Sequence, residues 1–272
     1  MSAAKKPLRI GLAGLGAVGL EVARRLIDGV DGLTLAAVAV RDPHKARRAL
    51  PQIGDMIALR TVAALADDCD VVVECLPPSV FRAVAESAID KGRIFMPLSV
   101  AQLLTHDDLV KRAKEKGARI IVPTGGLLAF DAVRAAAEGE IRSVTMVTRK
   151  PPDGLDGAPY LMERGISLAG LTQPRKVFEG SAREGARGFP TNVNVAAALS
   201  LAGIGPDRTR LEIWADPALT RNTHRIEVDA DTVRFSMTIE NVPSENPRTG
   251  KIVALSVVAA LRGLTSTLKV GS

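Results

Sequence analysis

The hydrophobic pattern of the first part of the chain predicts repeated strand-helix-strand units. Up to about Thr124, short apolar runs alternate with longer amphipathic segments, as expected when helices connect the strands of a parallel sheet. The expected strands are Leu8–Ala13, Leu33–Val40, Val71–Leu76, Arg93–Leu98 and Arg119–Val122. The clearest helix begins at Ala17 and stops at Gly29, with apolar residues at helical spacing. We therefore predict an α/β fold that opens with a doubly wound parallel sheet.

The pattern changes after Asp131, where longer strand-like segments replace this alternation. These segments are Val144–Thr148, Arg210–Ala215, His224–Val228 and Val233–Ile239. They favour a second, α+β domain with a mostly antiparallel sheet. Residues Ile252–Leu264 return to helical spacing, so this last helix could fold back onto the first domain. We expect one domain over residues 1–124 plus the C-terminal helix at about 251–272, and a second over residues 125–250.

Composition places the protein among globular chains without a membrane span. With 272 residues, of which 46% are hydrophobic, the chain can build a core in each of two domains. No stretch approaches the roughly 18 apolar residues of a membrane span, and Met1–Arg9 lacks the apolar core of a signal peptide. Cys69 and Cys75 flank a predicted buried strand, which favours buried thiols over a disulfide or metal pair. We expect a cytoplasmic protein without a metal site.

The formal charge of +6 raises the question of a nucleic-acid partner. The chain has one Trp and one Tyr, and its basic runs, 45–48 and 111–116, fall on predicted helices. Such runs more often mark solvated helix faces than a nucleic-acid surface. The charge is therefore interpreted only as favouring an anionic small ligand.

The strongest local motif is a glycine-rich turn, in which Gly14, Gly16 and Gly19 have the G-x-G-x-x-G spacing. It follows a predicted strand and opens a helix, the context in which these glycines permit a tight turn, a nearby pyrophosphate and close helix packing. The helix N-terminus would then face the phosphates. This context favours a Rossmann-type dinucleotide site over a turn without a ligand. The cofactor contacts expected in the first domain are Gly14, Gly16, Ala17, Val18, Arg41 and Pro77.

Arg41 bears on which dinucleotide is bound. It follows the second predicted strand, where an acidic residue would otherwise bind the ribose 2′-hydroxyl. An ion pair with the 2′-phosphate of NADP is worth about 1.5 to 3 kcal/mol, or roughly ten- to a hundredfold in affinity. Equally, Arg41 could be a solvated turn residue, with Asp42 capping a helix that starts at Pro43. We expect the protein to use both NAD and NADP.

Three polar clusters in the second half supply candidate chemistry. They are Thr148-Arg149-Lys150, Asn192-Val193-Asn194 and Asn222-Thr223-His224. His224 is suited to proton transfer near neutral pH, although it could equally be a satisfied strand residue. Arg149 and Lys150 could clamp carboxylates or form a solvated strand end. Asn192 could simply cap the apolar helix that follows it.

Several longer stretches carry a resemblance to a known family. They are Thr148–Pro152, Phe178–Glu184, Phe189–Ala197, Ala215–Pro217, Asn222–His224 and Pro243–Gly250. Over nearly all of its length the chain resembles the L-aspartate dehydrogenases. The resemblance implies reversible oxidation of L-aspartate to iminoaspartate with reduction of NAD or NADP. The imine would hydrolyse to oxaloacetate and ammonia, or pass to NAD biosynthesis.

The resemblance also implies roles for residues of the second domain. His224 maps to the catalytic histidine of the family's Asn-x-His motif, and further cofactor contacts map to Gly125, Gly126, Asn192 and Asn194. The substrate's two carboxylates must be held, and the residues expected to hold them are Arg149, Lys150, Asn194, Asn246 and Thr249. A homodimer is expected from the exposed strand edges of the second domain and is consistent with the family.

Two departures from the family pattern occur near the expected site. Thr124-Gly125-Gly126-Leu127 replaces Ser-Gly-Ala-Ile, and Ser99-Val100-Ala101-Gln102-Leu103 replaces Ser-Val-Gly-Ala-Leu. Gln102 adds a larger polar side chain where nicotinamide and substrate should meet. One alternative is therefore an enzyme for another amino or hydroxy dicarboxylate, or for a precursor such as dihydrodipicolinate. Another is a non-catalytic NADP-sensing protein, which would bind cofactor without turnover.

Overall fold

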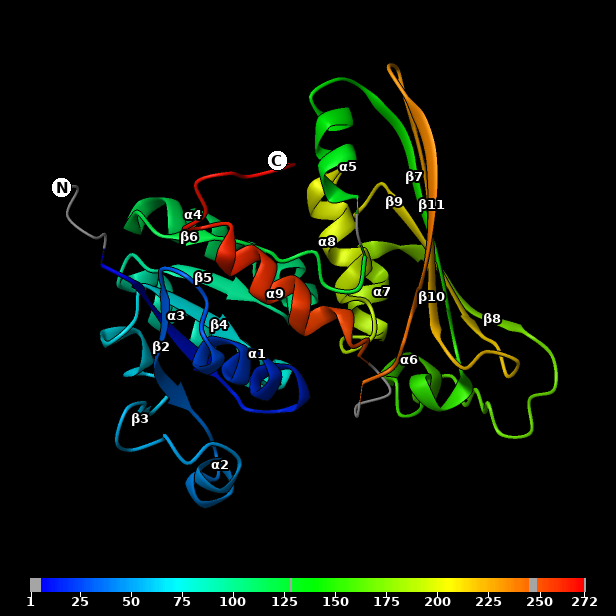
Figure 1. Cartoon of the computed structure of the whole chain (residues 1–272). Helices are drawn as coiled ribbons and strands as arrows, with labels where there is room; N and C mark the ends of the chain where they lie inside the picture. The colour runs from blue at the N-terminus through cyan, green and yellow to red at the C-terminus, as the bar shows by residue number, and fades with distance from the viewer. Residues whose placement is uncertain (1–5, 128, 245–248, 272) are drawn as a thin grey trace. The chain divides into compact units, whose positions relative to one another are not determined.

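The computed structural model describes residues 6–127, 129–244 and 249–271, which form two compact units (Figure 1). Unit 1 contains the described residues up to Ser99, together with His106–Pro123 and Ala254–Val270. Unit 2 contains Val100–Thr105 and the described part of Thr124–Val253. No helix in the described ranges is long and apolar enough to cross a membrane.

Unit 1 is built on a six-stranded parallel sheet with the strand order β3-β2-β1-β4-β5-β6. Its strands are β1 (Leu8–Ala13), β2 (Leu33–Ala39), β3 (Ala58–Arg60), β4 (Val71–Glu74), β5 (Ile94–Pro97) and β6 (Arg119–Ile120). Its helices are α1 (Ala17–Asp28), α2 (Pro43–Ala49), α3 (Phe81–Asp90), α4 (Asp108–Lys116) and α9 (Ile252–Arg262), with short 3-10 turns η1 (Leu65–Asp67) and η2 (Pro78–Val80). The doubly wound parallel sheet is confirmed, although β3 was not predicted.

The apolar runs form strands here because both faces of a parallel sheet are covered by helices. Ile10 on β1 and Val73 on β4 are fully buried and share one core with Val22 of α1. Val257 and Leu261 of α9 belong to the same core and are also fully buried. Burial of such side chains stabilises the fold by about 1.5–3 kcal/mol each, which ties the C-terminal helix to unit 1.

Unit 2 contains a five-stranded sheet with the order β11-β10-β7-β9-β8. The strands are β7 (Ile141–Lys150), β8 (Arg175–Ser181), β9 (Thr209–Ala215), β10 (Asn222–Ala230) and β11 (Arg234–Asn241). Only the β7–β9 pair among these strands is parallel, so the prediction of a mostly antiparallel sheet is confirmed. The helical segments are η3 (Val100–Leu104), α5 (Phe130–Ala137), η4 (Pro152–Leu155), α6 (Pro159–Glu163), α7 (Ala182–Gly188) and α8 (Asn194–Ala202).

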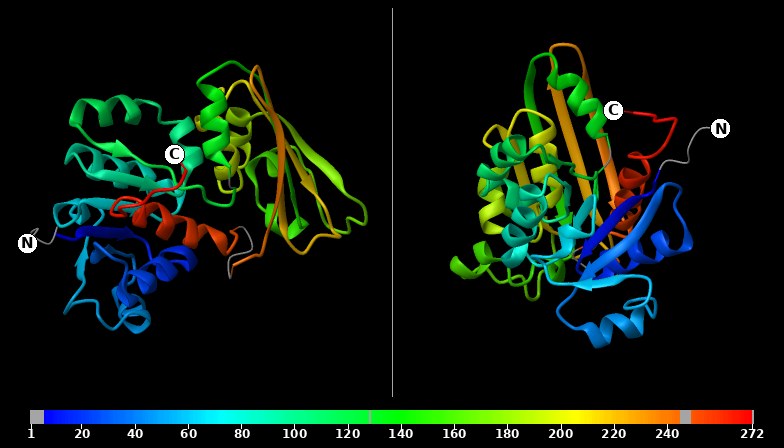
Figure 2. Two further views of the ribbon diagram at one scale, coloured as in Figure 1. Left: turned by 45° about the horizontal axis from the view of Figure 1, so that its top comes forward. Right: turned by 90° about the vertical axis from the view of Figure 1, so that its left-hand side faces the viewer.

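The two faces of this sheet differ sharply. Helices α5, α7 and α8 cover one face, whereas none of the described helices covers the other (Figure 1, Figure 2). Along β7, Met146, Thr148 and Lys150 are buried on the covered face, and the alternating residues between them are half-exposed. Because strand side chains alternate with a period of two, this pattern decides which residues share a face.

Candidate active site

The glycine-rich turn between β1 and α1 has the geometry that a dinucleotide requires. Gly14 has a φ of 101°, and a Cβ there would lie 2.8 Å from the carbonyl oxygen of Cys75. A Cβ on Gly19 would lie 2.1 Å from the carbonyl oxygen of Gly14, so only glycine permits this approach of helix and turn. By contrast, a Cβ on Gly16 would meet nothing within 4 Å. The turn therefore leaves open space at the N-terminus of α1, where Ala17 and Val18 begin the helix and phosphate binding is favoured.

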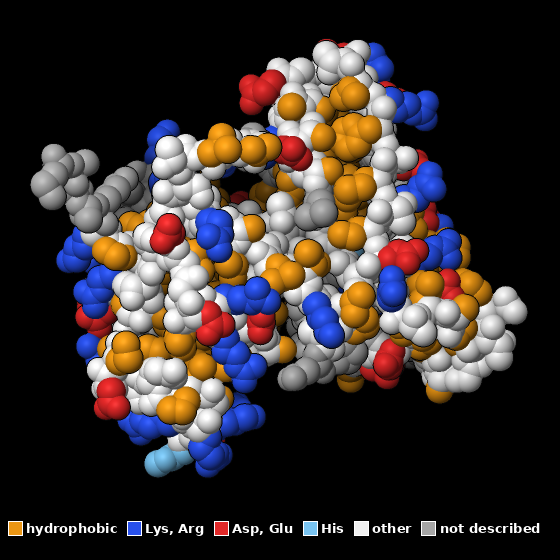
Figure 3. Space-filling model, viewed as in Figure 1, with side chains coloured by type: hydrophobic (Ala, Val, Ile, Leu, Met, Phe, Trp, Pro, Cys, Tyr) orange, Lys and Arg blue, Asp and Glu red, His pale blue; other side chains and the backbone are white. Residues whose placement is uncertain are grey.

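The residues after β2 show which role Asp42 has, one of the two points that the sequence left open for Arg41 and Asp42. Asp42 caps α2, because its Oδ1 accepts a hydrogen bond of 2.9 Å from the Lys45 backbone and Pro43 starts the helix. That hydrogen bond is the main reason that the pKa of Asp42 is lowered. Arg41 is exposed just before the cap. Figure 3 shows Lys and Arg side chains gathered at the position of α2, the helix whose N-cap residue directly follows Arg41 in the sequence.

Pro77 lies on the other side of the glycine turn, after β4. It adopts an extended conformation and is the N-cap residue directly before η2. The preceding turn is closed by a hydrogen bond of 2.8 Å, which the Leu76 backbone donates to the carboxylate of Glu74. Glu74 was not among the predicted site residues, although an acidic residue ending a fully apolar run is a signal for a buried carboxylate.

In unit 2 the structure brings His224 against Thr148. His224 on β10 is directly opposite Thr148 on β7, and its Nδ1 lies 3.2 Å from the Thr148 hydroxyl oxygen. The imidazole is almost fully buried, with 5% of its surface exposed. Burial, and secondly the positive charge of Lys150, lower the pKa of His224 from 6.5 to about 3. The ring is therefore uncharged at neutral pH.

Lys150 is an ammonium group buried on the same face of the sheet. It ends β7 and is only 2% exposed, and its Nζ donates a hydrogen bond of 3.0 Å to Oδ1 of Asn192. The interpretation of Asn192 as a helix cap is wrong: α8 begins at Asn194, and its N-cap residue, Val193, makes no side-chain cap bond. Asn192 instead orients a buried cation, because burying a charge is costly unless polar groups compensate for it.

Arg149 lies on the opposite face. Its side chain is 38% exposed, pairs with Asp216 at 3.6 Å and stacks over Trp214 at 4.6 Å. The sequence left open whether Arg149 or Lys150 clamps carboxylates. Of these two cations, Lys150 is the one that shares a face with His224.

The remaining predicted residues of unit 2 lie in turns or at helix starts. Asn194 accepts a hydrogen bond of 3.0 Å from the Ala101 backbone, next to the half-buried Gln102. Gly125 has a φ of 63°, and the Gly126 carbonyl accepts a hydrogen bond of 2.8 Å from the Asn241 side chain. The Thr249 carbonyl accepts a hydrogen bond of 2.8 Å from the Ser244 backbone. The predicted substrate residue Asn246 lies outside the described residues.

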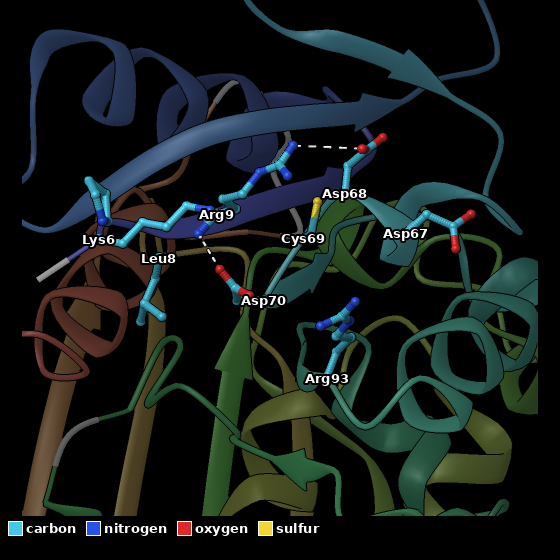
Figure 4. A pocket seen from close by; sticks show the side chains of 9 residues that line it. Lys6, Leu8, Arg9, Asp67, Asp68, Cys69, Asp70 and Arg93 are labelled. Atoms are coloured by element: carbon cyan, nitrogen blue, oxygen red, sulfur yellow. Dashed lines mark hydrogen bonds and ion pairs between the residues drawn. The ribbon is translucent and has the colours of Figure 1, made fainter.

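A depression of about 340 Å³ lies at the other end of the unit 1 strands (Figure 4). Its charged groups interact with neighbouring protein groups: Arg9 pairs with Asp68 at 3.6 Å, and Arg93 donates a hydrogen bond to the Ala66 carbonyl. It lies at the amino end of β1, whereas the glycine turn follows the carboxyl end. The depression is therefore separate from the glycine turn.

A parallel Rossmann-type sheet with a glycine turn, followed by a mixed-sheet domain with a buried histidine and lysine, defines a two-domain pyridine-nucleotide-dependent oxidoreductase. Residues 14–123 match the NAD-binding domain of homoserine dehydrogenase, and residues 131–264 match the C-terminal domain of aspartate dehydrogenase. The chain belongs to the aspartate dehydrogenase family, as its relatives also show.

Two of these relatives are similar over nearly their whole length. The L-aspartate dehydrogenase of Bradyrhizobium diazoefficiens is 54% identical, over 99% of this chain and 96% of its own. L-aspartate dehydrogenase 3 of Bordetella bronchiseptica is 48% identical, over 98% of this chain and 99% of its own. The crystal structure of aspartate dehydrogenase from Thermotoga maritima has the same fold, with a TM-score of 0.72 at 20% identity, covering 97% of this chain and 99% of that one.

Proposed function

We propose that the protein catalyses the reversible NAD(P)-dependent oxidative deamination of L-aspartate, through iminoaspartate, to oxaloacetate and ammonia. The observation that carries this proposal is the buried pair on one face of the unit 2 sheet: an uncharged His224 and the ammonium of Lys150. A base and a cation are what an amino dicarboxylate requires for deprotonation and for carboxylate binding. The names of the full-length relatives support aspartate as the substrate.

The residues of unit 1 fit a pyridine dinucleotide. Gly14 and Gly16 leave space for the pyrophosphate, and the backbone at Ala17 and Val18 would hold it at the helix N-terminus. Arg41 would bind the 2′-phosphate of NADP and leave NAD binding intact, so both cofactors would be used. Hydride acceptance is the chemistry that the bound nicotinamide supplies.

His224 would remove a proton from the substrate ammonium, so that the amine lone pair can form the C=N bond as hydride leaves the α-carbon. The Thr148 hydroxyl holds Nδ1 of the ring, which leaves Nε2 for the substrate. Lys150 would pair with a substrate carboxylate. The positive charge of Lys150 helps to lower the pKa of His224, and the substrate carboxylate would offset that charge. The ring would therefore become more basic when substrate is bound. After the ring has passed this proton to solvent, the neutral imidazole would activate the water that attacks the imine.

Asn194, Asn246 and Thr249 would complete the carboxylate site. As the family resemblance implies, Gly125, Gly126, Asn192 and Asn194 would contact the cofactor. We further propose that iminoaspartate released before hydrolysis supplies NAD biosynthesis, that the enzyme is cytoplasmic, and that it is a homodimer. The edge strands β8 and β11 support self-association of unit 2, because exposed sheet edges favour pairing with another chain.

The test follows the absorbance of NADH and NADPH with purified protein, oxaloacetate and excess ammonia. Oxidation that requires both oxaloacetate and ammonia supports amination of a four-carbon keto acid, and the two rates compare the cofactors. Oxidation that requires neither ammonia nor oxaloacetate would contradict the proposal. Binding of cofactor with turnover only on another dicarboxylate would assign a different substrate, with Gln102 as the first residue to replace.

A further inference from the structure

A carboxylate is completely buried at the carboxyl end of β4. The side chain of Glu74 has no exposed surface, and burial raises its pKa. Acidic side chains are almost never buried this deeply unless their oxygens are compensated. The proposed deamination chemistry makes no use of this group, so its position requires a separate explanation.

The partners of Glu74 come from two different turns. Oε1 accepts a hydrogen bond of 2.8 Å from the Leu76 backbone and one of 3.1 Å from the Ser99 hydroxyl, and Oε2 accepts one of 3.0 Å from the Ser99 backbone. Leu76 follows β4, whereas Ser99 follows β5. The Ser99 hydroxyl also lies 3.2 Å from the Leu76 carbonyl oxygen. One buried side chain therefore joins the two turns.

These turns lie on a defined side of the glycine turn. Strands β1, β4 and β5 are parallel neighbours, so their following turns leave the same edge of the sheet. The sheet order reverses between β1 and β4, which is where such folds bind a dinucleotide. Arg41, after β2, marks the adenosine side. The turns after β4 and β5 therefore border the other half of the cofactor, which carries the nicotinamide.

We propose that Glu74 is a positioning residue that fixes the nicotinamide side of the cofactor site by joining the turns after β4 and β5. Its two oxygens hold the backbone at Leu76, directly before Pro77, and at Ser99. The glycine turn packs against Cys75 and Leu76, but it also has a hydrogen bond outside this network, which the Gly14 backbone donates to the Ala39 carbonyl at 2.8 Å. Loss of the carboxylate should therefore loosen the nicotinamide side more than the phosphate and adenosine side.

This inference rests on the proposed cofactor binding, and the test separates the two. Dissociation constants for NADH and for ADP-ribose, which lacks the nicotinamide, are measured by titration of the wild-type protein and of Glu74→Gln. The amide keeps the size of the side chain but replaces one accepting oxygen with a donor, which cannot accept from the Ser99 backbone. We expect NADH to bind about tenfold more weakly and ADP-ribose to change less than about twofold.

Glu86→Gln is the matched control, because Glu86 pairs with Arg82 and Arg112 at the surface of α3 and should leave both constants unchanged. Ser99→Ala removes only the hydroxyl bonds and should weaken NADH about threefold with no change for ADP-ribose, so it tests the inference even if the Glu74 variant does not fold. Unchanged NADH binding in both variants, or equal losses for both ligands, would overturn the role of Glu74. Failure of the wild type to bind either ligand would overturn the proposed function and this inference with it.

Discussion

The buried imidazole of His224 predicts how the stability of the protein depends on pH. The unfolded chain takes up a proton on this ring near pH 6.5, whereas the folded protein keeps it neutral down to about pH 3. Between these values the unfolded state binds more protons. The free energy of unfolding should therefore fall as the pH decreases through this window, and the contribution of His224 should be complete only above pH 6.5.

The loss of unfolding free energy can be calculated from the lowered pKa of His224. Each pH unit inside the window corresponds to about 1.4 kcal/mol, so lowering the pH from about 7 to about 4 should remove about 3 kcal/mol through His224. Carboxylates also contribute to the pH dependence; the pKa of Asp90, for example, is lowered by its hydrogen bond to Arg112. A difference between two proteins that share these carboxylates therefore isolates the histidine.

The measurement is urea unfolding of the wild type and of His224→Asn at several pH values between about 4 and 7. Asparagine keeps a polar side chain without an ionisable ring, so its curve should lack the histidine contribution. The difference in the free energy of unfolding should shrink by about 3 kcal/mol as the pH falls. Parallel curves for the two proteins would refute a buried, neutral His224.

Three further substitutions, one of them with a matched control, test individual contacts. Lys150→Met should raise the KM for aspartate about a hundredfold in steady-state kinetics, because it removes the buried cation. Arg149→Met, on the opposite face, should change the KM less than about threefold. Equal effects would contradict the role of Lys150 in binding a substrate carboxylate. Arg41→Ala should weaken NADPH about ten- to a hundredfold in binding titrations and leave NADH within about twofold, and equal changes would identify Arg41 as a solvated turn residue. Thr148→Val should lower kcat about tenfold by releasing the ring of His224, and an unchanged kcat would show that the hydroxyl does not orient it.

The fold of unit 1 could be predicted because most of its strands are short, largely apolar runs and its first helix begins and ends at clear signals. β1 and α1 have the predicted bounds, apart from the glycine that ends the helix. β3 could not be found, because Ala58–Arg60 contains only three residues and the apolar run around it, Met56–Leu59, is only four residues long. β8 was also missed as a strand, since charged residues occupy three of its seven positions.

The sequence identified most residues of the candidate site, but it did not predict how their side chains are placed relative to one another. The sequence marked Thr148–Lys150, Asn192 and His224, yet the choice between Arg149 and Lys150 depends on the register that places His224 opposite Thr148. Once that register is known, the period of two along β7 settles which cation shares the face of the histidine. Glu74 was overlooked because its role depends on Ser99, which is distant in sequence and becomes adjacent only through the parallel pairing of β4 and β5.

The central claim, that His224 transfers protons in aspartate deamination, is tested most directly by comparing His224→Ala with the wild type. The turnover number is measured with L-aspartate and NAD or NADP, and the dissociation constant for NADH is measured on the same preparations. We predict that turnover falls by about a hundredfold or more while the dissociation constant stays within about twofold. Wild-type turnover in the variant would contradict the account and remove His224 from the mechanism.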